Sequence, residues 1–357
     1  MQGTPGGLAL FRCERCEAVN RVSPSSIAEV VALIGDARNQ SESLWFMGSG
    51  STTQPDGRTL VSTEKLKGVV DYRPDDLTVV VRAGTTLAEL DDILREYGHT
   101  AVLPETAPNR TVGGVIACGV SGYRRHRYGP TRDRVIGATI VTGYGEVVHA
   151  GGQLVKNVTG YDVARLVTGS YGALGFIAEV SLKLWPEDLA PRTVSVEDPA
   201  SIRRQLYQPI AALEIEDGGF VYVSGPQDPA LGGSASEGFD WPDPIDESVV
   251  VAVNVPARLV GEAVRQVRDV GATRFVAQHG VGVVDVGWNE IEESQIVDFR
   301  AWAESAGGSL VIRRHGQLNA SLSRFGSAPE TLDIQRRLKE LFDPDRVCNP
   351  GVLPGGV

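Results

Sequence analysis

Two glycine clusters within residues 111–186 constrain the fold of this chain more than any other feature. The first reads TVGGVIACGVSGYRRHRYGPTRDRV (residues 111–135) and the second KNVTGYDVARLVTGSYGALGFIAEVSLKLWP (residues 156–186). Glycine has no Cβ, so its backbone can pass very close to another group, and its entropy cost is tolerated where such an approach is needed. Glycine makes up 42 of 357 residues, about 12% against a usual 7% or so. The clusters therefore predict a backbone surface that lies against a large ligand.

A third glycine-rich segment, GSGSTT at residues 48–53, follows the predicted strand LWFM. A Rossmann fingerprint would need a helix to begin directly after these glycines, with its N-terminal amides on a pyrophosphate. The sequence QPDG at residues 54–57 breaks the chain instead. The remaining way for such a loop to hold phosphate is a nest of consecutive backbone N–H groups, helped by hydroxyl side chains.

These segments resemble the FAD-binding domain of the vanillyl-alcohol oxidase family, also called the PCMH type. Within it they are most similar to the FAD-binding E subunits of bacterial glycolate oxidases. The shared pattern is a TVGG turn, a run of small residues to SG, a YG, a D before a strand, K-x-x-x-GYD and GS-x-G-x-LG. Residues 342–351 (FDPDRVCNPG) resemble the closing motif of the family. The matching positions in the two clusters are Thr111, Gly113, Gly114, Ser121, Gly122, Tyr128, Gly129, Asp133, Lys156, Gly160, Tyr161, Asp162, Gly169, Ser170, Gly172, Leu174 and Gly175.

The resemblance implies FAD as the cofactor, held without a covalent link. The phosphate loop contains no histidine, and Cys118 does not occupy the place where the family forms a cysteinyl linkage. The cofactor-binding residues that the resemblance implies are Gly48, Ser49, Gly50, Ser51, Thr52, Pro104, Thr111, Gly113, Gly114, Ser121, Gly122, Tyr128, Gly129, Asp133, Gly172, Gly175 and Ile177.

The expected fold class is α+β, with more than one domain because 357 residues exceed what one core usually serves. We expect an N-terminal extension (1–19), a PCMH-type FAD-binding domain of two subdomains (20–186), a cap (187–341) and a closing segment that returns to the first domain (342–357). In the first domain, Ser26 with Glu29 and Thr86 with Glu89 predict capped helices.

After Pro186 the glycine clusters end and strand and helix patterns alternate. Helices are expected at 201–210, 258–270 and 290–305, with a hairpin at 213–223, strands at 249–255, 275–280, 281–286 and 310–314, and an irregular loop at 225–246. Two such passes suit a ferredoxin-like antiparallel sheet with helices on one face. This region would cap the substrate.

The composition limits the kinds of partner and the cellular compartment that can be expected for this protein. The formal charge of −11 argues against nucleic acid, whose phosphates attract basic patches. No apolar run approaches the roughly 20 residues that span a bilayer, and the N-terminus lacks a signal pattern. We expect a cytoplasmic protein, and partner subunits could hold it at the inner membrane as a peripheral protein. Cys13 and Cys16 form a lone CxxC, which fits surface thiols better than a four-ligand metal site.

The family oxidises alcohols, amines or 2-hydroxy acids by hydride transfer to flavin N5. A hydroxy acid needs a cation for its carboxylate and a base for its hydroxyl proton. The candidates are Arg124, Arg125 and His126 beside the first cluster, and His279, Arg313 and His315 in the cap. Metal-dependent D-lactate and D-2-hydroxyglutarate dehydrogenases of the superfamily carry H-x-x-G-D-G-N-x-H and E-x-x-HG. This chain has only HGVGVVD (279–285) and RRHG (313–316), so no metal is expected.

Two functions stay open from the sequence. One is an oxidoreductase for a small 2-hydroxy acid such as glycolate or D-lactate, alone or as a glycolate oxidase subunit. The other is a non-catalytic FAD-bearing subunit that docks a catalytic D-type flavoprotein and an iron-sulfur subunit. A third, the cell-wall enolpyruvyl reductase that shares this FAD domain, is disfavoured because its catalytic motifs are not evident.

Overall fold

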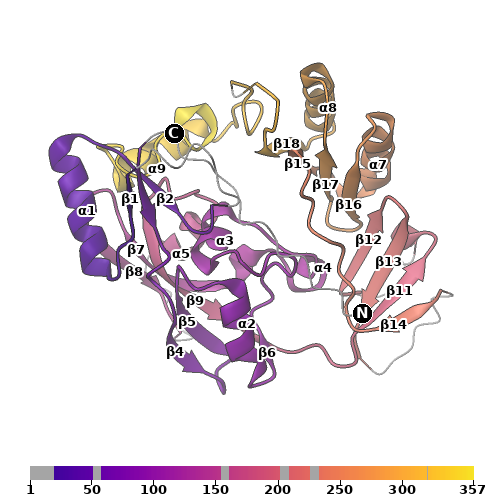
Figure 1. Ribbon diagram of the computed structural model, residues 1–357, viewed down its shortest axis with the longest axis horizontal. Coiled ribbons are helices and arrows are strands. Elements are labelled where there is room, and N and C mark those ends of the chain that lie inside the picture. The colour runs from indigo at the N-terminus through magenta and orange to yellow at the C-terminus, as the bar shows by residue number, and fades with distance from the viewer. Residues whose placement is uncertain (1–19, 51–57, 154–160, 202–208, 226–232, 320) are drawn as a thin grey trace, which may run out of the picture.

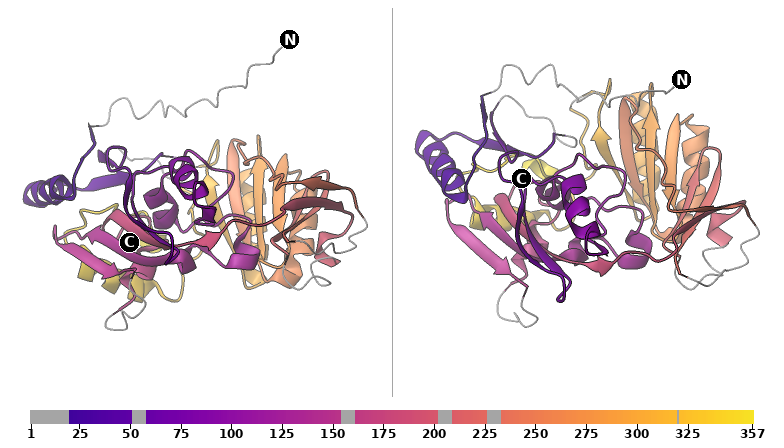
Figure 2. Two further views of the ribbon diagram at one scale, coloured as in Figure 1. Left: turned by 90° about the horizontal axis from the view of Figure 1, so that it is seen from below. Right: turned by 60° about the horizontal axis from the view of Figure 1, so that its bottom comes forward.

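The computed structural model describes residues 20–50, 58–153, 161–201, 209–225, 233–319 and 321–357. Figure 1 shows two halves, an N-terminal half that carries helices α1 to α5 and a cap that carries α7 and α8. Both views of Figure 2 place the sheet of the cap beside the N-terminal half. The predicted helix at 201–210 falls largely outside the described residues.

The N-terminal half begins with a parallel three-stranded sheet in the order β1-β3-β2. Helix α1 packs on it through Val30 and Ile34, which are buried with residues of β2 and β3. The hydroxyl of Ser26 accepts a hydrogen bond from the backbone N–H of Glu29 and so caps α1 as predicted. The elements are β1 (Arg21–Val22), α1 (Ile27–Gln40), β2 (Leu44–Met47) and β3 (Thr59–Ser62).

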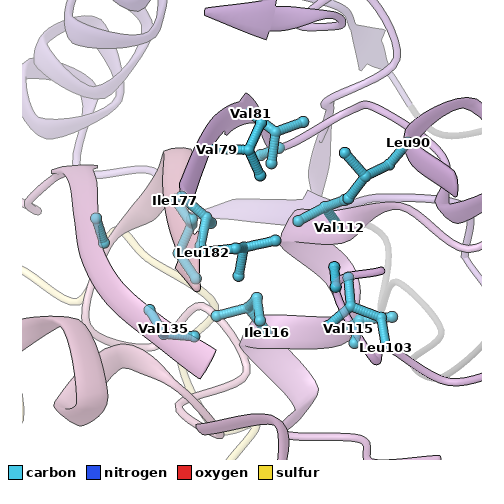
Figure 3. Close-up of a cluster of buried hydrophobic side chains, with 14 of the residues drawn as sticks. Val79, Val81, Leu90, Leu103, Val112, Val115, Ile116, Val135, Ile177 and Leu182 are labelled. Atoms are coloured by element: carbon cyan, nitrogen blue, oxygen red, sulfur yellow. The ribbon is translucent and has the colours of Figure 1, made fainter. Parts of the chain in front are cut away.

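A second, antiparallel sheet follows, in the order β4-β5-β9-β7-β8. Figure 3 shows its side chains meeting those of α2 and α3, with Val81, Leu90, Ile116 and Leu182 pointing toward one another. The predicted capping box of Thr86 and Glu89 is complete. The elements are β4 (Val69–Arg73), β5 (Thr78–Arg82), α2 (Leu87–Arg95), α3 (Val112–Cys118), α4 (Arg125–Tyr128), β7 (Val135–Val141), β8 (Val147–Gly151), α5 (Val163–Val167) and β9 (Phe176–Lys183).

The chain leaves this half through a short antiparallel pair, β6 (His99–Thr100) with β10 (Trp185–Pro186). Single turns of 3-10 helix lie at η2 (Thr131–Arg134), η3 (Ala257–Leu259) and η4 (Pro354–Gly356). Trp185 lies between the charged ends of Arg134 and Lys183, at 5.3 and 4.8 Å from its ring centre.

The cap is one antiparallel sheet of eight strands in the order β14-β11-β13-β12-β16-β17-β15-β18. Its last six elements run β15, α7, β16, β17, α8, β18 and pair as β16-β17-β15-β18, which is the predicted ferredoxin-like arrangement. The elements are β11 (Arg192–Val196), β12 (Ala211–Ile215), β13 (Gly218–Val223), β14 (Ala235–Glu237), β15 (Val249–Asn254), α7 (Val260–Asp269), β16 (Arg274–Gln278), β17 (Val283–Trp288), α8 (Glu293–Ser305) and β18 (Ser309–Arg314).

The two faces of the cap sheet have different neighbours. Phe275 and Ala277 of β16 are buried among residues of α7 and α8, whereas Val276 between them is buried with Tyr123 of the N-terminal half. The expected irregular loop at 225–246 contains strand β14, and its Trp241 stacks on Tyr222 with ring centres 4.2 Å apart. Aromatic contacts hold this segment on the sheet. The sequence of the segment has no periodicity, so it did not predict these contacts.

Helix α9 (Leu332–Phe342) returns to the N-terminal half before the expected closing segment begins. Leu338 and Phe342 pack against the core of Figure 3. Lys339 is buried, and its Nζ donates hydrogen bonds to the backbone oxygens of Ala173 and Cys348 and to Asp343 Oδ2. We therefore propose that the return starts at α9, near residue 332.

Candidate functional site

The TVGG sequence forms the first turn of α3 directly against β5. The Thr111 hydroxyl accepts a hydrogen bond of 3.2 Å from the Gly114 N–H. The Gly113 N–H donates to the oxygen of Ala83, and a Cβ on Gly113 would lie 2.5 Å from the Ala83 Cβ. Only glycine permits this approach of helix to strand. Thr111 and Gly113 therefore position the exposed side of α3.

A cleft opens between this turn, the loop after β2 and the turn before β9. Nine residues that the sequence predicted as flavin contacts line it together. The lining residues are Phe46, Met47, Gly48, Ser49, Gly50, Thr63, Arg110, Thr111, Gly113, Gly114, Ala117, Cys118, Tyr171, Gly172, Gly175, Phe176 and Ile177. The three glycine-rich segments, distant in sequence, thus form one surface.

The lining fits a large, flat ligand that carries polar groups. A Cβ on Gly48 would overlap the Thr111 hydroxyl, and one on Gly175 would lie 2.6 Å from the oxygen of Val141. Gly172 has φ +77°, a backbone conformation that favours glycine. The buried hydroxyl of Thr63 makes no hydrogen bond within the described part of the chain. Glycine is thus required at these three points of the lining, and the buried Thr63 hydroxyl remains to be satisfied.

The closing motif of the chain fixes two walls of this cleft. Asn349 Oδ1 accepts a hydrogen bond of 2.6 Å from the Phe46 N–H, and its Nδ2 donates one of 2.8 Å to the oxygen of Tyr171. Tyr171 has φ 53°, which is uncommon for a residue with a Cβ. Asn349 therefore joins β2 to the second glycine cluster and holds the strained turn.

Six of the predicted cofactor residues do not line this cleft: Pro104, Ser121, Gly122, Tyr128, Gly129 and Asp133. The Ser121 hydroxyl accepts from the Thr131 N–H, and the Tyr128 hydroxyl donates to Asp188 at 2.6 Å. A Cβ on Gly122 would overlap Glu105. Their role as flavin contacts stays a prediction, while Ser51, Thr52 and Lys156 lie outside the described residues.

The candidates for acid-base work have different surroundings. Arg124 is held by Glu105, with 2.8 Å between Nε and Oε1, and both side chains are largely buried. Glu105 also accepts from the Tyr123 N–H, so this pair shapes the loop after α3. The ring of His126 is half-buried.

The two cap histidines are engaged away from the cleft. His279 Nε2 lies 2.9 Å from Glu214, which also pairs with Arg268 of α7, so this cluster faces the helices of the cap. His315 Nε2 lies 3.1 Å from the oxygen of Leu322, in a second pocket beside Trp45. Neither histidine lines the flavin cleft.

Arginines gather instead where the cap meets the cleft. Arg313 of β18 pairs with Asp285 of β17 at 3.0 Å. Burial lowers the pKa of Arg110, and the charge of Arg313 lowers it further. Burial likewise lowers the pKa of Arg125, while the charge of Asp285 raises it and that of Arg313 lowers it further. Arg110 and Tyr171 were not predicted, although Tyr171 stands inside the GSYGALG block that marked the second cluster.

Comparison with known proteins now identifies the N-terminal half. Residues 20–151 match the sequence family described as FAD binding domain. The chain contains an FAD-binding domain. The glycine-lined cleft brings together nine of the predicted flavin contacts, and their role in binding FAD stays a prediction.

Several curated proteins are similar over part of the FAD-binding chain. Glycolate oxidase subunit GlcE of Escherichia coli (strain K12) is 34% identical over 54% of this chain and 54% of its own length. D-2-hydroxyglutarate dehydrogenase of Xanthomonas citri pv. viticola is 35% identical over 45% of this chain and 35% of its own length. D-lactate dehydrogenase of Archaeoglobus fulgidus is 31% identical over 46% of this chain and 38% of its own length. The chain thus spans about half, or less, of the length of these relatives.

The fold also has solved counterparts. An alkyldihydroxyacetonephosphate synthase superposes with a TM-score of 0.63 over 93% of this chain and 77% of its own, at 18% identity, which establishes likeness of fold. Among the described residues no helix is long and apolar enough to cross a membrane. Within the same residues no group of three or more His, Cys, Asp and Glu side chains is placed to hold a metal ion.

Proposed function

We propose that this protein is an FAD-dependent oxidoreductase that oxidises a small 2-hydroxy acid of the glycolate or D-lactate type. The observation that carries the proposal is the position of Arg110, which lines the FAD cleft and also lies near Arg313 of the cap. A guanidinium there can hold the carboxylate of a substrate beside the cofactor. The names of the three curated relatives support the same substrate class.

FAD, when bound, supplies an acceptor for the hydride that leaves the alcohol carbon. The residues of the chain bind and orient the cofactor and the substrate. The glycine turns at Gly48, Gly114 and Gly172 would take the cofactor, and Arg110 would fix the substrate carboxylate. Burial raises the pKa of Tyr171, so its phenol stays protonated near neutral pH and can donate a hydrogen bond to the substrate.

The test is reduction of the flavin by substrate. The purified, FAD-loaded protein is mixed without oxygen with glycolate or D-lactate, and the flavin absorbance is followed. We expect bleaching, turnover with an artificial dye as acceptor and unchanged turnover after treatment with a chelator. Loss of turnover after treatment with the chelator, with recovery when zinc is added, would contradict the expectation that the reaction needs no metal.

A second candidate is a non-catalytic FAD-bearing subunit that docks a D-type flavoprotein and an iron-sulfur subunit. The distance of His279 and His315 from the cleft favours it, because neither can serve there as the base. Co-expression with the neighbouring genes separates the two candidates. Turnover only in the assembled complex, with a flavin in this chain that substrate never bleaches, would support the subunit.

A further inference from the structure

A second cavity lies where a loop of the cap meets the closing segment of the chain. Its volume is about 330 Å³. It is lined by Trp45 of β2, by His315 and residues 321–325 of the cap, and by residues 351–356 of the closing segment. None of these residues lines the flavin cleft. A cavity of this size suits a small organic molecule.

The lining of the second cavity offers hydrogen-bond donors and positive charge. Arg324 is half-buried there, and a guanidinium group stays charged in a protein. Nε2 of His315 donates to the oxygen of Leu322, which leaves Nδ1 to take up a proton. Ser321 and Ser323 add hydroxyl groups, and the described residues of the lining include no aspartate or glutamate. The cavity therefore complements a ligand with negative charge.

Trp45 provides an independent sign of a ligand. Its side chain lines the cavity and is only 6% exposed, yet its indole Nε1–H makes no hydrogen bond within the described part of the chain. Arg58 lies over the ring at 5.6 Å, and Val352 and Leu353 pack in the same cluster, so the indole is held in place. A buried donor without an acceptor is unfavourable. An oxygen of a ligand can accept this hydrogen bond.

The second cavity is in contact with the wall of the flavin cleft. Phe325 of the cavity meets Tyr171 of the cleft edge to face, with 5.5 Å between ring centres. Trp45 also packs in one cluster with Tyr171 and Met47, which both line the cleft. A ligand that holds the cap loop against the closing segment would therefore restrict the motion of Tyr171.

We propose that the second cavity is a binding site for a small organic phosphate with a flat apolar body, and that this ligand stabilises the flavin site. A phosphate group has three strong acceptor oxygens, which suit Arg324, the two serine hydroxyls and the Trp45 indole. Leu322 and Phe325 provide apolar surface for the body of the ligand. The ligand is a regulator that bridges the cap and the closing segment, and it is not a substrate.

The test is isothermal titration calorimetry of the FAD-loaded protein with phenyl phosphate. This probe combines a phosphate group with a flat apolar ring. We expect it to bind with a dissociation constant about tenfold or more below that of phenol, which lacks the charge-assisted contacts. Its dissociation constant should also lie about tenfold or more below that of inorganic phosphate, which buries no ring.

Variants assign the probe to the second cavity. Arg324→Gln should weaken binding about tenfold or more, and Trp45→Phe, which keeps a ring and removes the donor, about threefold. Arg265→Gln removes the same charge from an exposed position on α7 and should bind the probe as the unchanged protein does. If Arg324→Gln does not fold, Ser321→Phe at an exposed position of the lining provides the same test by filling the cavity.

The rate of FAD release measures the effect on the flavin site. Saturating phenyl phosphate should slow release about fivefold or more, because a ligand that favours one arrangement of Tyr171 is coupled to the cofactor that shares it. Phe325→Ala removes the contact with Tyr171 and should abolish this effect at saturating probe. Neither measurement requires turnover of a hydroxy acid.

The outcomes decide each part of the proposal. Absence of binding, or binding that both Arg324→Gln and Ser321→Phe leave unchanged, would refute the site. Displacement of the probe by glycolate or D-lactate would show that the cavity belongs to the substrate site, which would also overturn the proposal. Binding that depends on Arg324 and leaves the rate of FAD release unchanged would refute the action on the flavin site.

Discussion

Single glycines decide whether the cofactor can approach the backbone. Gly114 lines the cleft, and a Cβ there would lie 2.9 Å from the Thr111 hydroxyl that caps α3. We expect Gly114→Val to abolish retention of FAD, because its branched side chain would displace the cap and enter the cleft. The flavin-to-protein ratio after desalting measures this. Gly261→Val, where a Cβ meets nothing within 4 Å, is the control. A Gly114→Val protein that keeps its full flavin would place the cofactor elsewhere.

The two described cysteines should differ in reactivity. Cys118 lines the cleft, whereas Cys348 is fully buried, and burial raises its pKa so that the thiol stays neutral. In a background with Cys13 and Cys16 changed to serine, a maleimide should label Cys118 in the apoprotein, and FAD should slow this labelling about tenfold or more. Mass spectrometry of peptides identifies the labelled site. Rapid labelling of Cys348 in the folded protein, or no protection of Cys118 by FAD, would contradict the arrangement.

A buried ion pair closes the end of helix α9, and its lysine also donates a hydrogen bond to the oxygen of Ala173 in the N-terminal half. Lys339 Nζ lies 2.6 Å from Asp343 Oδ2, and Asp343 also accepts hydrogen bonds from the N–H groups of Val347 and Cys348. Removing one partner of a buried pair leaves an uncompensated charge, at about 3–5 kcal/mol. Lys339→Met should therefore lower the free energy of unfolding by about this amount in a urea titration.

Its control lies on the same helix. Arg337 is exposed, and Arg337→Met should change the free energy of unfolding by less than about 0.5 kcal/mol. Lys339 and Asp343 both form hydrogen bonds with the backbone of Cys348, which directly precedes Asn349. We therefore also expect Lys339→Met to weaken FAD binding, because Asn349 links β2 to Tyr171. Equal stability of the two variants would show that α9 is held by its apolar contacts alone.

The two halves of the molecule are joined by an aromatic cluster. Tyr123 of the N-terminal half is buried against the cap, 5.7 Å between ring centres from Trp241, which stacks on Tyr222. Aromatic pairs of this kind contribute about 0.5–1.5 kcal/mol beyond the area they bury. Trp241→Ala should uncouple the halves, so that calorimetry resolves two unfolding transitions.

Limited proteolysis provides a second measurement of the effect of Trp241→Ala. The segment around β10 connects the halves, and the Tyr128 hydroxyl ties Asp188 to helix α4. In Trp241→Ala this connection should be cut faster than in the unchanged protein. Val297→Ala, at an exposed position on α8, serves as the control. One cooperative transition in Trp241→Ala would show that the halves are coupled by other contacts.

Most of the local structure could be predicted from the amino-acid sequence alone. The caps at Ser26 and Thr86, the strand and helix order after residue 249 and the glycine turns depend on residues close together in sequence. Backbone conformation and side-chain period are local properties, so neighbouring residues reveal them. The nine predicted cofactor residues that line one cleft were implied by the family resemblance, and the fold brings their distant segments together.

The partners of the charged side chains depended on packing between distant segments. The six basic candidates looked alike in sequence. The fold places Arg124 on Glu105 and His279 on Glu214, and it exposes Arg125 to the charge of Asp285. The charge of Arg313 on β18 acts on Arg110 of the cleft although the two residues are about 200 positions apart in the sequence. An ion pair forms between whichever opposite charges the tertiary contacts bring within a few ångströms, and no local pattern of residues encodes that distance.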